Sequence, residues 1–228
     1  MTNETVSISL ATFQRMPRYL KFLKEKQTEG QKYISSVAIA DALLLNAALV
    51  KKDLSQAIIS EGKPKVGYSV SELICDIEEF LGYNNTKDAV LVGAGKLGQA
   101  LMEYKGFESY GLNIIAGFDV REELIGKEIS GKKILHADKL ASMIKKLDVK
   151  MAILTIPQDS AQQTTDTLIA SGIKAIWNFS SCHITVPDNV ALKNENMAAS
   201  LAILSSQLKE ILKIEAIQEK TAKKGAQS

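Results

Sequence analysis

The sequence predicts an α/β protein in which a helix-turn-helix domain with a β wing precedes a doubly wound parallel sheet, and a long helix follows the sheet. Three observations lead to this fold class. Residues 1–68 combine helical periodicity with a Gly- and Pro-containing loop, residues 69–195 alternate short apolar runs with helical segments, and residues 196–228 continue one helical pattern. Strands that alternate with helices are typical of βαβ units and a parallel sheet. We therefore expect three parts with these boundaries.

Composition agrees with a folded protein that needs no cross-links. The 228 residues are 46% apolar and 24% charged, and they include two cysteines and two histidines. So few cysteines favour a reducing compartment, so we expect a cytoplasmic protein. The start MTNETVSIS lacks a secretory pattern, and apolar runs such as MAILTI are far shorter than the ~20 residues of a membrane span. We expect no membrane association, and the isolated His136 and His183 predict no metal site.

The first 68 residues contain three predicted helices. Apolar residues at three- and four-residue steps mark the first (Phe13, Met16, Leu20, Leu23), and Pro17 must lie in its first turn or kink it. Ser35 or Ser36 is the expected cap of a short helix, VAIADALL. Asn46 is the expected cap of a third, AALVKKDLSQAI, after a very short turn. Two helices separated by about three residues predict a helix-turn-helix, and KPKVGY after them resembles a wing.

Charge points to an anionic partner for this part of the chain. Residues 1–68 carry ten Lys or Arg against six Asp or Glu, whereas the remainder is slightly acidic. Side chains near the start of a recognition helix reach base edges, and lysines neutralise phosphates. The candidate DNA-contacting residues are therefore those of the third helix and the wing: Asn46, Lys51, Lys52, Ser55, Lys63 and Lys65. The alternative is a solvated basic face with no partner.

The second part begins with an amphipathic helix from Val70 to Leu81. The strand DAVLVGAG and the helix KLGQALMEYKGF follow it. NIIAGFDV, KILHA, MAILTIP and AIWNFS are the further predicted strands, with helices DKLASMIKKLD and QQTTDTLIASG among them. Ala198 to Glu219 is one long helical pattern, and we expect the polar tail after it to fray.

A phosphate-binding loop follows the first strand of the sheet. Gly93, Gly95 and Gly98 form the motif GAGKLG, which also includes Ala94, Lys96 and Leu97 and opens a helix. In such a motif the glycines allow a tight turn, close approach of a pyrophosphate and close helix packing, while the helix N-terminus attracts phosphate. Asp119 ends the next strand and can accept hydrogen bonds from ribose hydroxyls, which favours NAD(H) over NADP(H). The alternative is a glycine turn without a ligand.

Two later strands end in residues that could complete such a site. Thr155 and Pro157 follow MAIL, and Asn178 and Phe179 follow AIW. Doubly wound folds bind ligands at the carboxyl ends of their strands, so Asn178 could bind a nicotinamide and Phe179 could pack near its ring. The alternative for each is loop capping or core filling.

An oxidoreductase would need an acid or base beside the nicotinamide. His183 is the one well-placed candidate, since Cys182 and His136 are less suitable. No segment large enough for a substrate domain follows residue 190. We therefore expect no enzyme activity, and keep as the alternative an NAD-dependent reductase that uses His183 as acid. A third possibility is a DNA-binding architectural protein whose dinucleotide fold is vestigial.

Together these segments resemble the Rex family of redox-sensing transcriptional repressors, from about Met16 to Leu208. The resemblance rests on MPRYLKFL, ISS with AIADAL, VKKDLS, KVGYSV, VGAGKLGQAL with YKGF, FDV, ILTIP and GIKAIWNF, in this order. It implies a winged-helix DNA-binding domain, a Rossmann domain that binds NADH and NAD⁺, and a domain-swapped C-terminal helix that builds a homodimer. It also implies a repressor that binds a palindromic operator and leaves it when NADH accumulates.

The chain departs from the family at several positions. Lys51 stands where the family usually has an arginine, which removes bidentate base contacts, and Leu44 replaces the usual glycine of the turn. The family couples its DNA-binding head to the partner's cofactor site through an Arg, a Tyr and an Asp. These correspond to Lys21, Tyr104 and Asn196 here, so the resemblance implies that Tyr104 lies near the cofactor and that the carboxylate is missing.

Overall fold

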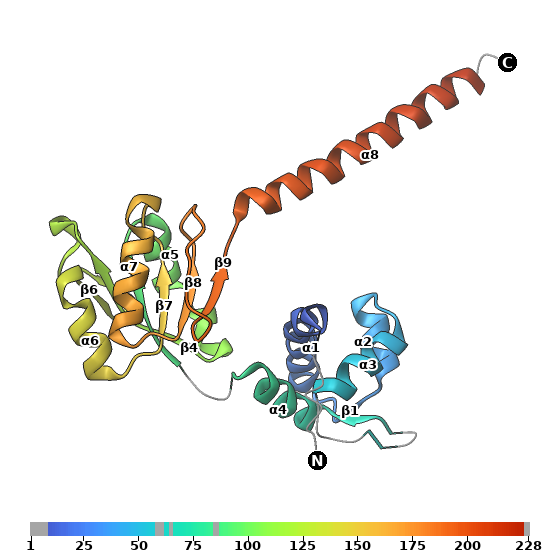
Figure 1. Ribbon diagram of the computed structural model, residues 1–228. Helices are drawn as coiled ribbons and strands as arrows, with labels where there is room; N and C mark the ends of the chain where they lie inside the picture. The colour runs from blue at the N-terminus through green and yellow to red at the C-terminus, as the bar shows by residue number, and fades with distance from the viewer. Residues whose placement is uncertain (1–8, 58–61, 64–65, 84–86, 226–228) are drawn as a thin grey trace. The chain divides into compact units, whose positions relative to one another are not determined.

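The structure, a computed structural model, describes residues 9–57, 62–63, 66–83 and 87–225, and it divides into two compact units (Figure 1). Unit 1 comprises Met1–Thr86 and Lys105–Leu112, and unit 2 comprises Lys87–Tyr104 and Asn113–Ser228. Within the described residues, no helix is long and apolar enough to cross a membrane.

Unit 1 is a small helical domain with a two-stranded sheet. Its elements are α1 (Leu10–Thr28), β1 (Tyr33–Ile34), α2 (Ser36–Leu43), α3 (Ala47–Ala57), β2 (Tyr68–Ser69) and α4 (Val70–Leu81). The predicted apolar stripe of α1 lies in the core through Met16, Leu20 and Leu23, whereas Phe13 is exposed. Pro17 lies inside α1 and not in its first turn, because the helix begins earlier, at Leu10, after the Ser9 cap.

The helix-turn-helix forms as predicted. The Ser35 hydroxyl accepts the Ala38 N–H at 3.1 Å and caps α2, and the side-chain Oδ1 of Asn46 accepts the Ala48 N–H at 2.8 Å and caps α3. Leu44 ends α2 in the left-handed conformation, with φ 55° and ψ 46°. A side chain with a Cβ is strained there, which is why glycine suits this turn.

The wing is also present. β1 and β2 pair antiparallel, and Lys63 and Gly67 form an antiparallel bridge. Gly67 has φ +93°, and a Cβ there would overlap the carbonyl oxygen of Ile34. Lys65 lies outside the described residues.

The boundary between the units differs from the expected one. We expected the second domain to begin at residue 69, but α4 packs into the core of unit 1 through Val70, Leu73, Ile74 and Ile77. Its apolar face needs a partner, and the face left by α1 provides it. Unit 1 therefore includes α4, and the chain enters the large sheet at Lys87.

Unit 2 is a doubly wound sheet of seven strands in the order β5-β6-β4-β3-β7-β8-β9. The β4–β6, β3–β7, β7–β8 and β8–β9 pairs are parallel, and β5–β6 is antiparallel. Without β5, this is the 3-2-1-4-5-6 order of dinucleotide-binding sheets. The strands are β3 (Lys87–Val92), β4 (Leu112–Asp119), β5 (Glu128–Ile129), β6 (Lys132–His136), β7 (Met151–Leu154), β8 (Ala175–Asn178) and β9 (Ala191–Asn194).

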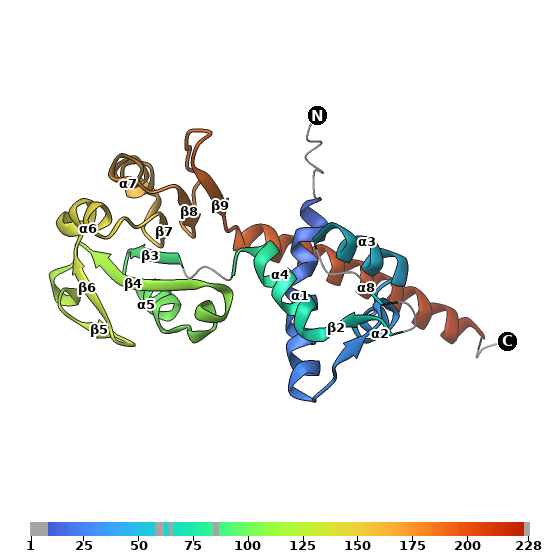
Figure 2. The same cartoon turned by 90° about the horizontal axis from the view of Figure 1, so that it is seen from below.

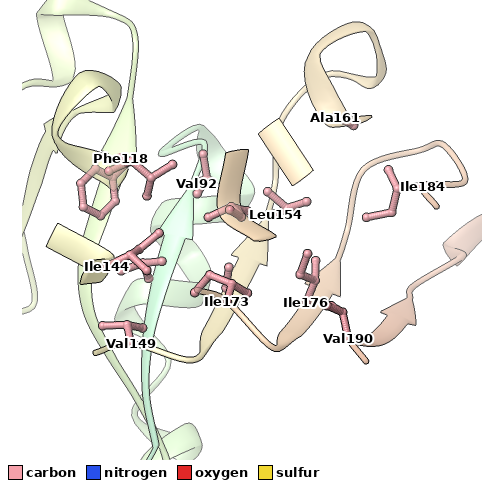
Figure 3. Packing of buried hydrophobic residues seen from close by; sticks show 14 of the residues in the cluster. Val92, Phe118, Ile144, Val149, Leu154, Ala161, Ile173, Ile176, Ile184 and Val190 are labelled. Atoms are coloured by element: carbon pink, nitrogen blue, oxygen red, sulfur yellow. The ribbon is translucent and has the colours of Figure 1, made fainter. Parts of the chain in front are cut away.

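Helices cover both faces of this sheet. Figure 2 shows α5 (Lys96–Glu103) on one face and α6 (Leu140–Leu147) and α7 (Gln158–Ser171) on the other. Figure 3 shows Val92, Phe118 and Leu154 of the central strands packing with Ile144 of α6. The 3₁₀ segments η2 (Glu122–Leu124) and η3 (Ala137–Lys139) also belong to unit 2, whereas η1 (Lys105–Tyr110), which follows α5 in the chain, belongs to unit 1. The helix that we expected to continue through Phe107 ends at Glu103, and β5 and β9 were not predicted.

The C-terminal helix α8 (Met197–Gly225) is longer than the pattern predicted. Side chains described from Met197 to Glu215 are all exposed, including eight large apolar ones (Met197, Leu201, Ile203, Leu204, Leu208, Ile211, Leu212, Ile214). Met197, Leu201, Leu204, Leu208 and Ile211 follow alternating steps of four and three, which places them along one stripe.

Candidate functional site

A cavity of about 900 Å³ lies at the carboxyl ends of β3, β4 and β7 in unit 2. Strand order reverses here, because the chain leaves β3 toward β4 on one side and later returns to β7 on the other. Ligands of doubly wound sheets bind at such a switch point. The cavity is lined by Val92, Gly93, Gly95, Phe118, Asp119, Val120, Arg121, Ala137, Asp138, Leu140, Thr155, Ile156, Pro157, Ser160, Gln163, Thr164 and Thr167.

The three glycines of the loop differ in what a side chain at each position would contact. Gly93 has φ +96°, and a Cβ there would lie 2.6 Å from the Thr155 carbonyl oxygen. A Cβ on Gly98 would overlap the Gly93 carbonyl oxygen. The fold therefore requires Gly93 and Gly98.

Gly95 is not required by the fold. Its φ is −71°, and the nearest heavy atom to a Cβ there is Arg121 Nη2 at 3.6 Å. The absence of a side chain leaves room beside the first N–H groups of α5, which no earlier helical turn can satisfy. A phosphate fits this position, since helix N-termini attract anions. Lys96 and Leu97 lie exposed at the start of the same helix.

The carboxylate of Asp119 is buried at the end of β4. Its Oδ2 accepts the Ala94 N–H at 2.7 Å, and its Oδ1 accepts the Arg121 N–H at 2.9 Å. Burial opposes the charge, but the hydrogen bonds from Arg121 and Ala94 outweigh it and lower the pKa of Asp119. Asp119 is therefore ionised at neutral pH and also holds the glycine loop.

Arg121 is a cavity residue that we did not predict. Its Nε and Nη2 donate to the two oxygens of Asp119 at 3.0 and 2.9 Å, and its side chain is 48% exposed. The position two residues after a strand-ending Asp was the available signal. The α7 residues Ser160, Gln163, Thr164 and Thr167 were also missed, because they become neighbours of the loop only when α7 packs on the sheet.

The end of β7 lies where we expected. The Thr155 hydroxyl donates to the Gly93 carbonyl at 2.5 Å and ties the two strand ends together. Thr155 and Pro157 both line the cavity, and Pro157 immediately precedes α7. The structure thus brings together five of the predicted cofactor residues around one space: Gly93, Gly95, Asp119, Thr155 and Pro157.

Asn178 and Phe179 are not among the residues that line the cavity. The Asn178 amide donates to the Cys182 carbonyl at 3.0 Å and to Asn194 Oδ1 at 2.8 Å, and it accepts the Ser180 N–H at 2.9 Å. Phe179 packs on Trp177, with ring centroids 4.8 Å apart. In this structure Asn178 organises the loop after β8, so its contact with a nicotinamide stays a prediction.

The histidines lie outside the cavity lining. His183 is exposed in the loop after β8. His136 ends β6, with Nδ1 3.1 Å from an Asp138 carboxylate oxygen. Across the part of the chain that the structure describes, no group of three or more His, Cys, Asp or Glu could hold a metal ion.

In unit 1, Lys51, Lys52 and Ser55 form an exposed polar face on α3. The Ser55 hydroxyl donates to the Lys52 carbonyl at 2.8 Å. Lys63 is exposed at the wing, and Asn46 is exposed while it caps the helix. These residues thus lie on the second helix of the helix-turn-helix and on the wing, the elements that enter DNA grooves in such domains.

Beneath this face, Asp53 forms a network that we did not predict. Arg15 contacts both of its carboxylate oxygens at 2.6 and 2.7 Å, and the Tyr19 hydroxyl donates at 2.7 Å. Thr12 Oγ1 donates at 3.1 Å, and Asp53 itself is 1% exposed. Although burial opposes its charge, the hydrogen bonds from Arg15, Tyr19 and Thr12 lower the pKa of Asp53. Burial and the neighbouring Asp53 raise the pKa of Tyr19 to about 12. The network fixes α3 against α1.

The three residues of the expected coupling set lie on the surface of their own units. Lys21 is exposed on α1, and Tyr104 is 53% exposed directly after α5, at the end away from the glycine loop. Asn196 Oδ1 accepts the Ala199 N–H at 2.9 Å and so caps α8.

Two family models match the chain. Residues 84–182 match a CoA binding domain, and residues 7–55 match a putative DNA-binding protein N-terminus.

Relatives match nearly all of it. The redox-sensing transcriptional repressor Rex of Bacteroides fragilis is 38% identical over 205 residues, which is 90% of this chain and 93% of that protein. Its counterpart in Treponema denticola is 43% identical over 190 residues, or 83% and 90%. The crystal structure of RSP with β-NAD⁺ and operator DNA is 33% identical, with a TM-score of 0.85 and coverage of 94% of this chain and 98% of that one. The complex of RSP with β-NADH has a TM-score of 0.81 at the same identity, with coverage of 93% and 100%.

Proposed function

The chain belongs to the Rex family of redox-sensing transcriptional repressors, and we propose that it binds a palindromic operator and leaves it when NADH binds. The observation that carries this proposal is the pairing, in one chain, of a winged helix-turn-helix with a glycine-lined cavity at the switch point of a doubly wound sheet. The RSP structure with β-NAD⁺ and operator DNA covers 94% of the same chain.

The cavity fits NADH and NAD⁺. We assign the pyrophosphate to the space at Gly95 and the N-terminus of α5, since both the open volume and the helix dipole favour an anion there. We assign the adenosine ribose to the carboxylate of Asp119, and Thr155 and Pro157 line the same cavity. When bound, the cofactor supplies a nicotinamide ring that is a cation when oxidised and neutral when reduced. The apolar walls at Val92, Ile156 and the neighbouring proline disfavour a buried cation and so favour NADH.

The DNA-binding head is α3 and the wing. Lys51 and Lys52 neutralise phosphates or reach base edges from the exposed face of α3, and Lys63 adds a contact from the wing. Asp53 does not touch DNA, because it is buried under this face, but it holds α3 in position.

The exposed apolar stripe of α8 is the proposed dimer interface. Eight large apolar side chains on one helix are more than a monomer leaves in water, and a second copy of α8 would cover them. A palindromic operator requires two such copies, whose recognition helices must lie ~34 Å apart to enter successive major grooves.

Release follows if NADH favours a spacing of the two heads that does not fit DNA. A ligand shifts such an equilibrium only by its difference in affinity for the two states, and full switching requires ~5 kcal/mol. Lys21, Tyr104 and Asn196 remain the proposed coupling set.

The rival function is an NAD-dependent reductase with His183 as acid. His183 does not line the cavity, and the relatives are named transcriptional repressors. We infer that the chain does not catalyse hydride transfer. NADH consumption with a panel of carbonyl compounds tests this, and turnover that is lost in His183→Ala would favour the enzyme.

The proposed function is tested by titrating a labelled palindromic operator with the protein, with no nucleotide, NAD⁺ or NADH present. We expect NADH to weaken binding strongly and NAD⁺ to have little effect. Gly95→Val should bind the operator as the wild type does but no longer respond to NADH, because a Cβ at this position meets only Arg121 Nη2, at 3.6 Å, while the valine side chain enters the space assigned to the phosphate. A full NADH response in this variant would remove the cofactor from the glycine loop.

A further inference from the structure

The adenosine-ribose end of the cavity carries an ion pair. Asp119 and Arg121 share two hydrogen bonds there, at 2.9 and 3.0 Å, and both residues line the cavity. Arg121 Nη2 also lies near the glycine loop, 3.6 Å from the position of a Cβ on Gly95.

An acidic residue at this position normally excludes a 2′-phosphate by repulsion. Here the Arg121 guanidinium pairs with the Asp119 carboxylate, and the pair has no net charge. The repulsion between Asp119 and a 2′-phosphate, which the sequence predicts, is therefore offset. A guanidinium has five N–H donors, and the bidentate contact uses two of them. Because the Arg121 side chain is 48% exposed, the remaining donors can reach a ligand. Arginine is the residue that accommodates a 2′-phosphate in NADP-binding relatives of this fold.

We propose that Arg121 makes this site accept a phosphate on the 2′ oxygen of the adenosine ribose, so that the site binds NADPH in addition to NADH. The proposal rests on the proposed cofactor site and extends it to a second nucleotide class. The sensor would then respond to both reduced pools, and Arg121 would determine the selectivity between them.

Other charges at this end of the cavity do not reverse the argument. Asp138 also lines the cavity, but its carboxylate is 89% exposed and is screened by water. Glu123 is the other acid whose charge acts on Arg121, and it lies on the exposed 3₁₀ segment η2. Neither has a hydrogen bond to Arg121, whereas Asp119 has two from its side chain.

The test measures binding of NADH and NADPH to the full chain by fluorescence, with 5′-AMP, 2′,5′-ADP and 3′,5′-ADP as competitors. We expect NADPH to bind within about ten-fold of NADH in the wild type, and Arg121→Ala to raise the NADH preference by about ten-fold or more, the effect of one charge-assisted hydrogen bond. Arg121→Lys should lie between the two, because it keeps the charge but not the fork. Lys139→Ala is the matched control, since it removes an exposed cation of η3 that does not line the cavity.

The outcomes separate the two proposals. A preference for NADH that is the same in wild type, Arg121→Ala and Lys139→Ala overturns this inference while NADH binding upholds the cofactor site. Tighter competition by 3′,5′-ADP than by 2′,5′-ADP also overturns it, because the phosphate would then lie at the 3′ oxygen. Absence of any NADH or NADPH binding overturns both proposals.

Discussion

Replacing Asp53 by alanine should loosen the recognition helix without touching its DNA-facing side. The change removes two hydrogen bonds from Arg15 at 2.6 and 2.7 Å, one from Tyr19 at 2.7 Å and one from Thr12 at 3.1 Å. Breaking a buried ion pair from one side typically costs about 3–5 kcal/mol. Arg15 is 21% exposed and can regain water, so we expect the lower end, about 3 kcal/mol.

Hydrogen exchange of the full chain measures this cost locally. Amides of α3 and of the facing part of α1 should exchange about a hundred-fold faster in Asp53→Ala, as a loss of about 3 kcal/mol implies, while those of the large sheet should not change. Asp41→Ala removes an exposed carboxylate of α2 and is the control. Equal protection of α3 in the two variants would refute the role given to Asp53.

The same network predicts a pH dependence for unit 1. The pKa of Asp53 is lowered by folding, so its stabilisation is present above the unfolded value of ~4 and is lost as pH falls below it. The pKa of Tyr19 is raised to about 12, so its share is present below ~10 and is lost as pH rises toward the raised value. Asp53→Asn should lack the acid decline that this carboxylate causes. Thermal unfolding followed by circular dichroism at pH 3–11 measures this, and identical acid profiles would contradict it.

The remaining predictions concern single positions in both units. Gly98→Ala should destabilise unit 2 by about 1 kcal/mol or more, because its Cβ would overlap a backbone oxygen, whereas Gly95→Ala should unfold as the wild type does. Equal melting temperatures of the two variants would contradict the loop packing. Leu44→Gly should stabilise unit 1 by roughly 0.5–1 kcal/mol by relieving a left-handed leucine, while the same change at helical Val37 should destabilise it. In Lys52→Ala, the logarithmic salt slope of operator binding should flatten by about one unit, and an unchanged slope removes its phosphate contact. Asn196→Asp keeps the helix cap and restores a carboxylate, so the operator affinity should respond more strongly to NADH, and an unaltered response would exclude this coupling position.

Most helices and strands could be predicted because their caps and their apolar periodicity lie within the segment itself. Ser35 and Asn46 cap the helices that we expected, and the apolar stripe from Val70 to Leu81 forms one helix. The partner of this stripe lies far away in the chain, so the sequence pattern does not identify it. For this reason we expected the boundary after residue 68, whereas unit 1 continues to Thr86. The edge strand β9, Ala191–Asn194, has too short a pattern to be predicted.

The residues of the cofactor site likewise include some that the sequence predicts and some that it does not. Gly93, Gly95 and Asp119 were predicted because a strand, a turn and a helix follow one another in sequence. Arg121 was missed because its importance depends on the direction of a side chain. Asp53 was missed because its partners lie 34 to 41 residues away, and only packing of α1 on α3 brings them together.

We propose above all that the redox state of the bound nucleotide controls the affinity of the protein for operator DNA. Operator affinity measured by fluorescence anisotropy, with total nucleotide fixed and the NADH:NAD⁺ ratio varied, tests it most directly. We expect affinity to fall steadily as the ratio rises, and to recover when NADH is oxidised in the same sample. An operator affinity that stays constant over the whole range of ratios would contradict the account.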